Sequence, residues 1–170
     1  MNESLTTTGD VPGIPATPLT WGRRLTREFV WVACLIVGGI FVWSGSAHLS
    51  NPYYFLSTIY QYELTSAPLG AFIAAYVPFV ELVLAVCLLS GILNRPAWTL
   101  TSLLLLAFVA VQGSALARGL KISCGCFGPE INRPVDSTSI SFTAALAVLA
   151  VLATIVVYRS NSPIQPRRTG

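Results

Sequence analysis

Residues 29–47 read FVWVACLIVGGIFVWSGSA, an apolar run without a charged side chain. A helix rises about 1.5 Å per residue, so this run is long enough to cross a hydrocarbon core of roughly 30 Å. Arg23, Arg24 and Arg27 precede it. The run therefore predicts a first transmembrane helix. A signal peptide cleaved after Gly45-Ser46-Ala47 is the alternative, although its basic and apolar segments would both be unusually long.

Three more apolar segments follow, and each has the length of a membrane span. They cover residues 69–93, 97–117 and 140–158, with a turn expected at Asn94-Arg95-Pro96. The stretch from Asn51 to Leu64 mixes tyrosines with polar residues and has no Lys or Arg, which suits a helix in the headgroup region. The predicted fold class is all-α: a polytopic membrane protein, a four-transmembrane-helix bundle with a short interfacial helix between spans one and two.

The composition indicates an integral membrane protein. Of 170 residues, 54% are hydrophobic and 10% are charged, whereas a soluble domain has roughly 45–50% and 25%. The net charge of +3 is small and no basic run carries interleaved aromatic residues, so nucleic acid is not an expected partner. We divide the chain into a disordered cytoplasmic tail (1–28), a transmembrane domain (29–158) and a cytoplasmic C-terminal tail (159–170).

The distribution of basic residues predicts the orientation in the cell (inner) membrane. One side of the predicted bundle holds more of them than the other, and the richer side is normally cytoplasmic. That side carries Arg23, Arg24, Arg27, Arg95, Arg159, Arg167 and Arg168, and the other carries Arg118, Lys121 and Arg133. We therefore expect both termini in the cytoplasm and the loop between spans three and four outside, where disulfides form and persist.

That outer loop carries the residues most suited to chemistry. It begins RGLKISCGCFGP at Arg118, so a single glycine separates Cys124 from Cys126. A disulfide across such a tight turn is expected to be strained and therefore easily reduced. The cations of Arg118 and Lys121 favour the thiolate, the reactive form of a reduced cysteine. We interpret Cys124 and Cys126 as a redox dithiol.

A local structural bridge is the alternative interpretation of these cysteines, and a metal site is a second one. Two cysteines under-fill a tetrahedral zinc site and the loop has no histidine, so no metal is expected. Cys34 and Cys87 lie at similar depth in spans one and two, and a second, inner dithiol is an alternative to simple packing.

Glu81 lies near the middle of the second span, three residues after Pro78. An ionisable residue at that depth is a functional hypothesis by default, as a proton carrier or a neighbour of a quinone-like electron carrier. The alternative is a neutral carboxyl bonded to a backbone carbonyl freed by Pro78. Glu81→Leu should be tolerated in stability, because it removes a costly polar group, whereas Glu81→Gln should preserve folding and impair turnover if the carboxyl moves protons.

His48 lies at the outer end of the first span, on the side of the cysteine loop. Its imidazole suits acid or base work during thiol exchange, and the alternative is an interfacial histidine with a wet ring edge. Gln112, in the outer part of the third span, is interpreted as an interhelical hydrogen-bonding residue.

The motifs PFVE at 78–81, Arg118-Gly119 and CGCFG at 124–128 resemble the methylamine-utilisation MauE family of DoxX-like membrane proteins. The similarity covers roughly residues 29–158. It implies a four-helix bundle, a part in forming or maintaining disulfides in an extracytoplasmic enzyme, and a thioredoxin-like partner. Carried over by residue, it points to Cys124 and Cys126, with Arg118 and Glu81 as matching polar positions. The chain departs from the family at His48, where a lysine is usual.

These observations leave two functions open. The first is a membrane thiol:disulfide oxidoreductase component, as in the maturation of methylamine dehydrogenase, with a membrane quinone or an inner dithiol receiving the electrons. The second is a noncatalytic membrane anchor subunit of a DoxX-like redox complex, in which the Cys-Gly-Cys is a structural bridge. The two differ in whether the cysteine pair cycles between its oxidised and reduced forms.

Overall fold

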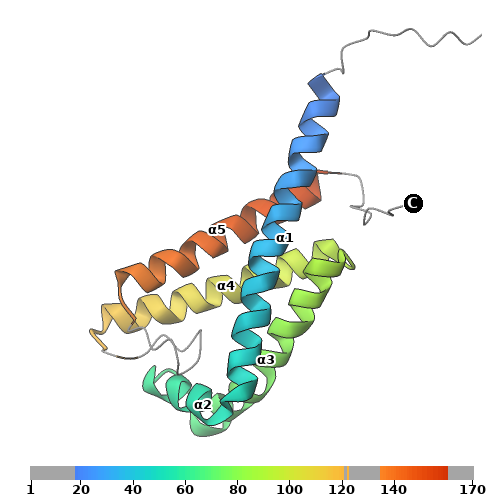
Figure 1. Ribbon diagram of the computed structural model, residues 1–170. Coiled ribbons are helices and arrows are strands. Elements are labelled where there is room, and N and C mark those ends of the chain that lie inside the picture. Colours follow the sequence, from blue (N-terminus) through green and yellow to red (C-terminus); the bar gives the residue numbers. More distant parts are fainter. Residues whose placement is uncertain (1–17, 121, 123–134, 161–170) are drawn as a thin grey trace, which may run out of the picture.

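The computed structural model describes residues 18–120, 122 and 135–160, and this part of the chain is entirely helical apart from turns and connections (Figure 1). Four of its helices are long and apolar enough to cross a membrane, which confirms the predicted fold class. A shorter helix joins the first two of them. The elements in chain order are α1 (Pro18–Ser50), α2 (Pro52–Gln61), α3 (Ala67–Ser90), α4 (Asn94–Ala117) and α5 (Ser137–Arg159).

Two helix starts differ from the sequence prediction. Helix α1 begins at Pro18, so the expected boundary at residue 28 does not mark its start. Hydropathy locates where a helix enters the hydrocarbon, whereas helical structure continues into the polar residues before it. Helix α4 begins at Asn94, because the turn is made by residues 91–93, where Gly91 (φ 71°) ends α3 in the left-handed conformation. Pro96 then lies in the first turn of α4, where proline is tolerated.

Helices α1 and α3 form one tightly packed pair. The buried face of α1 alternates steps of four and three residues, the spacing of a knobs-into-holes seam. This face includes Val30, Cys34, Val37, Phe41, Ser44 and His48. Two glycines bring the helices close: a Cβ on Gly38 would lie 2.9 Å from Leu89 Cγ, and one on Gly45 would lie 3.1 Å from the backbone oxygen of Pro78. Small residues let transmembrane helices approach in this way.

Helices α4 and α5 form the second pair (Figure 1). Alanines 147, 150 and 153 of α5 are buried, which allows close approach without a large side chain. Polar groups add to the contact: the hydroxyls of Ser102 and Thr154 lie 2.9 Å apart, and Thr154 also donates to the carbonyl of Trp98. The Arg95 guanidinium lies 5.8 Å from the centre of the Tyr158 ring. This contact places the start of α4 beside the end of α5.

One end of the bundle carries helix α2 (Figure 1). We call the end formed by α2, the last turns of α1 and α4 and the first turns of α3 and α5 the cysteine-loop end. Helix α2 lies across this end (Figure 1), and the Tyr60 hydroxyl ties it to α3 by donating to the carbonyl of Ala67 at 2.9 Å. The first turns of α5 are fixed by Asp136, whose carboxylate accepts from the Ser139 N–H at 2.8 Å.

Candidate functional site

A buried polar cluster joins α1 to α3 near the cysteine-loop end. Glu81 is 1% exposed and His48 is 3% exposed. One carboxylate oxygen of Glu81, Oε2, lies 3.2 Å from His48 Nδ1, and the other, Oε1, accepts from the Ser44 hydroxyl at 3.3 Å. Glu81 thus has partners from the neighbouring helix at both oxygens. The alternative in which its carboxyl bonds only to a backbone carbonyl freed by Pro78 does not describe this geometry.

The local sequence explains why these groups meet. Ser44 and His48 are one helical turn apart on the buried face of α1, so both side chains point toward α3. Gly45 lies between them and allows α3 to come close at Pro78, one turn before Glu81. A larger residue at position 45 would move α3 away from both partners of Glu81.

The His48 ring is fixed on a second side by α2. It stacks on the ring of Phe55, with the two centres 3.8 Å apart and the planes inclined by 18°. The imidazole is therefore enclosed by a carboxylate and an aromatic ring. The alternative of an interfacial histidine with a wet ring edge is wrong, because this side chain is buried.

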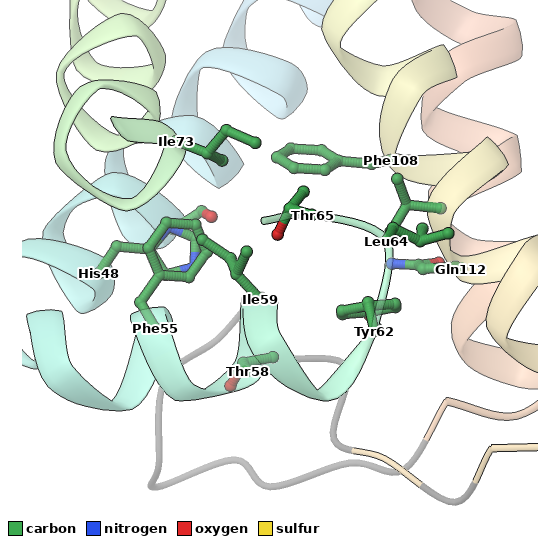
Figure 2. A pocket seen from close by; sticks show the side chains of 12 residues that line it. His48, Phe55, Thr58, Ile59, Tyr62, Leu64, Thr65, Ile73, Phe108 and Gln112 are labelled. Carbon is green, nitrogen blue, oxygen red and sulfur yellow. The ribbon is translucent and has the colours of Figure 1, made fainter. Parts of the chain in front are cut away.

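A cavity of about 130 Å³ lies beside this cluster (Figure 2). Its wall comes from α1, α2, the α2–α3 connection, α3 and α4, and it is largely apolar with a few polar groups. The lining residues are Ser44, His48, Phe55, Thr58, Ile59, Tyr62, Leu64, Thr65, Ile73, Phe108, Val111 and Gln112. The cavity therefore separates the α1/α3 pair from α4 at the cysteine-loop end.

The polar groups of the cavity lie on different sides of it. In Figure 2, His48 is on the α1 side, Gln112 on the α4 side, and Thr65 lies between them. Gln112, which was predicted to lie between helices, is 2% exposed and lines the cavity. The Thr65 hydroxyl oxygen is buried and has no hydrogen-bond partner in the described part of the chain. A buried hydroxyl without a partner is unfavourable, and it marks where a polar ligand atom would be stabilised.

The base of the cysteine loop packs on the cavity wall. The Val135 N–H donates to the Ile122 carbonyl at 2.8 Å, so the two ends of the loop are bonded to each other. Both residues belong to a small apolar cluster with Tyr62 and Val111, which also line the cavity. The Arg118 guanidinium donates to the Tyr62 carbonyl. These contacts connect the end of α4 to the α2–α3 connection.

The residues singled out in the sequence lie in different parts of the chain. Cys124, Cys126 and Lys121 lie outside the described residues. Cys34 and Cys87 are free thiols rather than a bonded pair, and Cys34 is buried in the core between the helices. Of the predicted supporting residues, His48 and Glu81 contact each other. Arg118 lies at the loop base, where it donates to the carbonyls of Ser114 and Tyr62.

The sequence did not indicate the pairing of Glu81 with His48 and Ser44, or the cavity. The pair is separated by 33 positions, and its contact depends on the register of α1 against α3. One usable signal was present: Ser44 and His48 continue the apolar seam of α1, and polar residues on such a seam require partners on the facing helix.

The fold and the site define a class, a multi-pass membrane protein with four spanning helices and a buried polar cluster beside a cavity at one end. The chain matches the family model described as methylamine utilisation protein MauE over residues 26–158. It therefore belongs to the MauE family, as the resemblance of its motifs implied. A comparison with curated proteins and one with solved structures gave no match.

Proposed function

We propose that this protein is a membrane thiol:disulfide redox component that forms or maintains disulfides in extracytoplasmic proteins, with Cys124 and Cys126 as the exchanging pair. The observation that carries the proposal is the anchored base of the loop between α4 and α5. The Ile122–Val135 bond and the Arg118–Tyr62 contact hold both ends of this loop against the helices. A short Cys-Gly-Cys on an anchored base is suited to repeated reaction with soluble partners.

The chemistry is thiol–disulfide exchange. A thiolate of one protein attacks a sulfur of the other protein's disulfide, the S–S bond breaks, and the released sulfur leaves as a thiolate. The second cysteine of the attacking pair then closes its own disulfide and releases the partner. The cations of Arg118 and Lys121 near Cys124 favour the thiolate there. Cys124 is therefore our preferred attacking residue when the pair reduces a partner's disulfide, and our preferred leaving sulfur when a client thiolate attacks the Cys124–Cys126 disulfide. The partner we propose is a thioredoxin-like extracytoplasmic protein.

The family description supports a client in methylamine metabolism. The matched model is described as a methylamine utilisation protein. We propose that the client is an enzyme of that process whose disulfides require maturation, such as methylamine dehydrogenase. Proteomics of the partners trapped in mixed disulfides will identify the client.

We further propose that the cysteine-loop end faces the extracytoplasmic side and that both termini are cytoplasmic. The described arginines near the opposite end include Arg24, Arg27, Arg95 and Arg159, and basic residues favour the cytoplasmic side. In a variant with Cys124 as its single cysteine, a membrane-impermeant maleimide should label intact spheroplasts. Labelling that requires opening of the inner membrane would reverse the topology.

The exchange itself is tested by replacing Cys124 and Cys126 singly with Ser. Neither residue belongs to a spanning helix, so the variants should insert and fold normally. The variant that keeps the attacking cysteine cannot release its partner and should accumulate a mixed disulfide, visible on a non-reducing gel and removed by dithiothreitol. Normal oxidation of client proteins in a strain with Ser at both positions would exclude this function and favour the noncatalytic anchor subunit.

A further inference from the structure

We infer that the cavity beside His48 binds the head group of a membrane quinone. The inference rests on the proposed thiol function, because it identifies the electron acceptor that this function needs. The size of the cavity, the chemistry of its wall and the exposure of its lining at Leu64 support it.

The volume fits one six-membered ring. The cavity measures about 130 Å³, and an engineered apolar cavity of roughly 150 Å³ in another protein holds benzene. Its wall presents flat and branched apolar groups, among them Phe55, Phe108, Ile59 and Ile73. Such a wall accepts an aromatic or quinoid ring, and a charged or strongly hydrated ligand would lose its water there without replacement.

The polar groups select a ring with oxygens at opposite edges. His48 and Gln112 lie on opposite sides of the cavity and the Thr65 hydroxyl lies between them (Figure 2). The buried Thr65 oxygen lacks a protein partner in the described residues, so a ligand carbonyl would satisfy it. A quinone carries two ring carbonyls on opposite carbons, whereas a lipid acyl chain offers no acceptor at all.

A quinone also needs a route for its hydrocarbon tail. Leu64 lines the cavity and is 47% exposed on the surface of the bundle. The cavity wall at Leu64, in the α2–α3 connection, therefore lies at the surface of the bundle, and we infer that the cavity opens there. A ring held between Phe55 and Phe108 would direct its tail through this side toward the lipid.

The reaction balances in electrons and protons. Once the Cys124–Cys126 disulfide has oxidised a client, the pair is left as two thiols. These two thiols lose their S–H bonds and form the S–S bond again, which releases two electrons and two protons. The quinone takes up both electrons and both protons and becomes the quinol, with an O–H bond at each ring oxygen. His48 and Glu81 share a proton along their 3.2 Å contact, so they hold a proton next to the ring at the α1 side.

The test measures binding directly, without the thiol reaction. Full-length protein in detergent micelles is titrated with a decyl-substituted benzoquinone by calorimetry, with decanol as the ringless probe. We expect saturable binding of the quinone and no displacement by decanol. Val111→Phe, which fills the cavity, should weaken binding by about tenfold or more, equivalent to about 1.4 kcal/mol.

Two further variants separate a lost site from lost folding. Val86→Phe makes the same change at a position of α3 that is 63% exposed, and it should leave the affinity unchanged. Thr65→Val keeps the side-chain shape and removes only the hydroxyl, so it should weaken binding by about three- to tenfold. Equal affinity in all variants, no saturable binding, or displacement by decanol would overturn the inference.

The outcome is distinguishable from a failure of the proposed function. The Cys124→Ser/Cys126→Ser protein should bind the quinone like the wild type, because the cavity contains neither cysteine. If the wild type forms mixed disulfides but does not bind the quinone, the inference is wrong and the thiol function stands. If the quinone binds and no thiol exchange occurs, the thiol function is wrong, and with it the role of the quinone as its acceptor.

Discussion

Removing the carboxyl of Glu81 is the most informative single perturbation of this molecule. Glu81→Leu eliminates a hydrogen-bond partner of both His48 and Ser44, two side chains that are 3% and 6% exposed. The sequence alone suggested that this substitution would be tolerated, since it removes a polar group from a membrane span. The structure reverses that expectation, because a buried imidazole and a buried hydroxyl each lose a hydrogen bond to the carboxyl.

The size of the effect depends on whether the pair is neutral or ionic. Hydrogen bonds between transmembrane helices have coupling energies averaging about 0.6 kcal/mol, with a maximum near 1.7 kcal/mol. Breaking a buried ion pair by removing one partner costs about 3–5 kcal/mol. Because both side chains are almost fully enclosed and the carboxyl faces an imidazole at 3.2 Å, we expect a coupling energy above about 2 kcal/mol, beyond the range of neutral bonds.

A double-mutant cycle of Glu81→Leu and His48→Leu measures this coupling. The free energy of unfolding of the four proteins is determined by titration with dodecyl sulfate in mixed micelles, and the loss of the Phe55 ring contact cancels within the cycle. Ser102→Ala and Thr154→Val supply the reference, because their hydroxyls form a neutral contact at 2.9 Å between α4 and α5. A His48–Glu81 coupling no larger than the Ser102–Thr154 coupling would refute a strong buried pair.

Two other predictions concern the packing and the loop base. Gly45→Ala should lower the free energy of unfolding by about 1–3 kcal/mol through overpacking, since its Cβ would lie 2.9 Å from Leu82 Cγ. Gly39→Ala is the control: a Cβ there would have nothing within 4 Å, so this variant should be neutral or slightly stabilising. Arg118→Ala should speed amide hydrogen exchange at residues 119–122 without a large change in global stability. Arg27→Ala, at the far end of α1, should leave exchange at these residues unchanged. If Arg118→Ala also leaves it unchanged, the Tyr62 contact does not hold the loop base.

Much of the fold could be predicted from the sequence because the bilayer constrains it simply. Four apolar runs of sufficient length predicted four spans, and the aromatic stretch after Asn51 predicted the short helix now seen as α2. Helix ends were less accurate, because hydropathy does not report helical turns beyond the hydrocarbon. The start of α1 at Pro18 and of α4 at Asn94 are examples.

The site was less accessible to sequence reasoning than the fold. Glu81 and His48 were singled out separately, and the one signal that they are partners was the place of Ser44 and His48 on the apolar seam of α1. Their meeting depends on two helices approaching through Gly38 and Gly45 and on the rotation of each helix about its axis. Thr65 gave no signal at all, because a threonine in a polar connection is ordinary until the structure shows that its hydroxyl is buried.

Tyr62 connects the two parts of the molecule to which we assign chemistry. Its side chain lines the cavity and also packs with Ile122 and Val135 at the base of the cysteine loop, while its carbonyl accepts from Arg118. A ring that enters the cavity therefore contacts a residue that supports the loop. Since close-packed interiors transmit strain, we expect occupancy of the cavity to affect the position of the loop base through Tyr62 and Val111, which line the cavity and belong to the apolar cluster at the loop base.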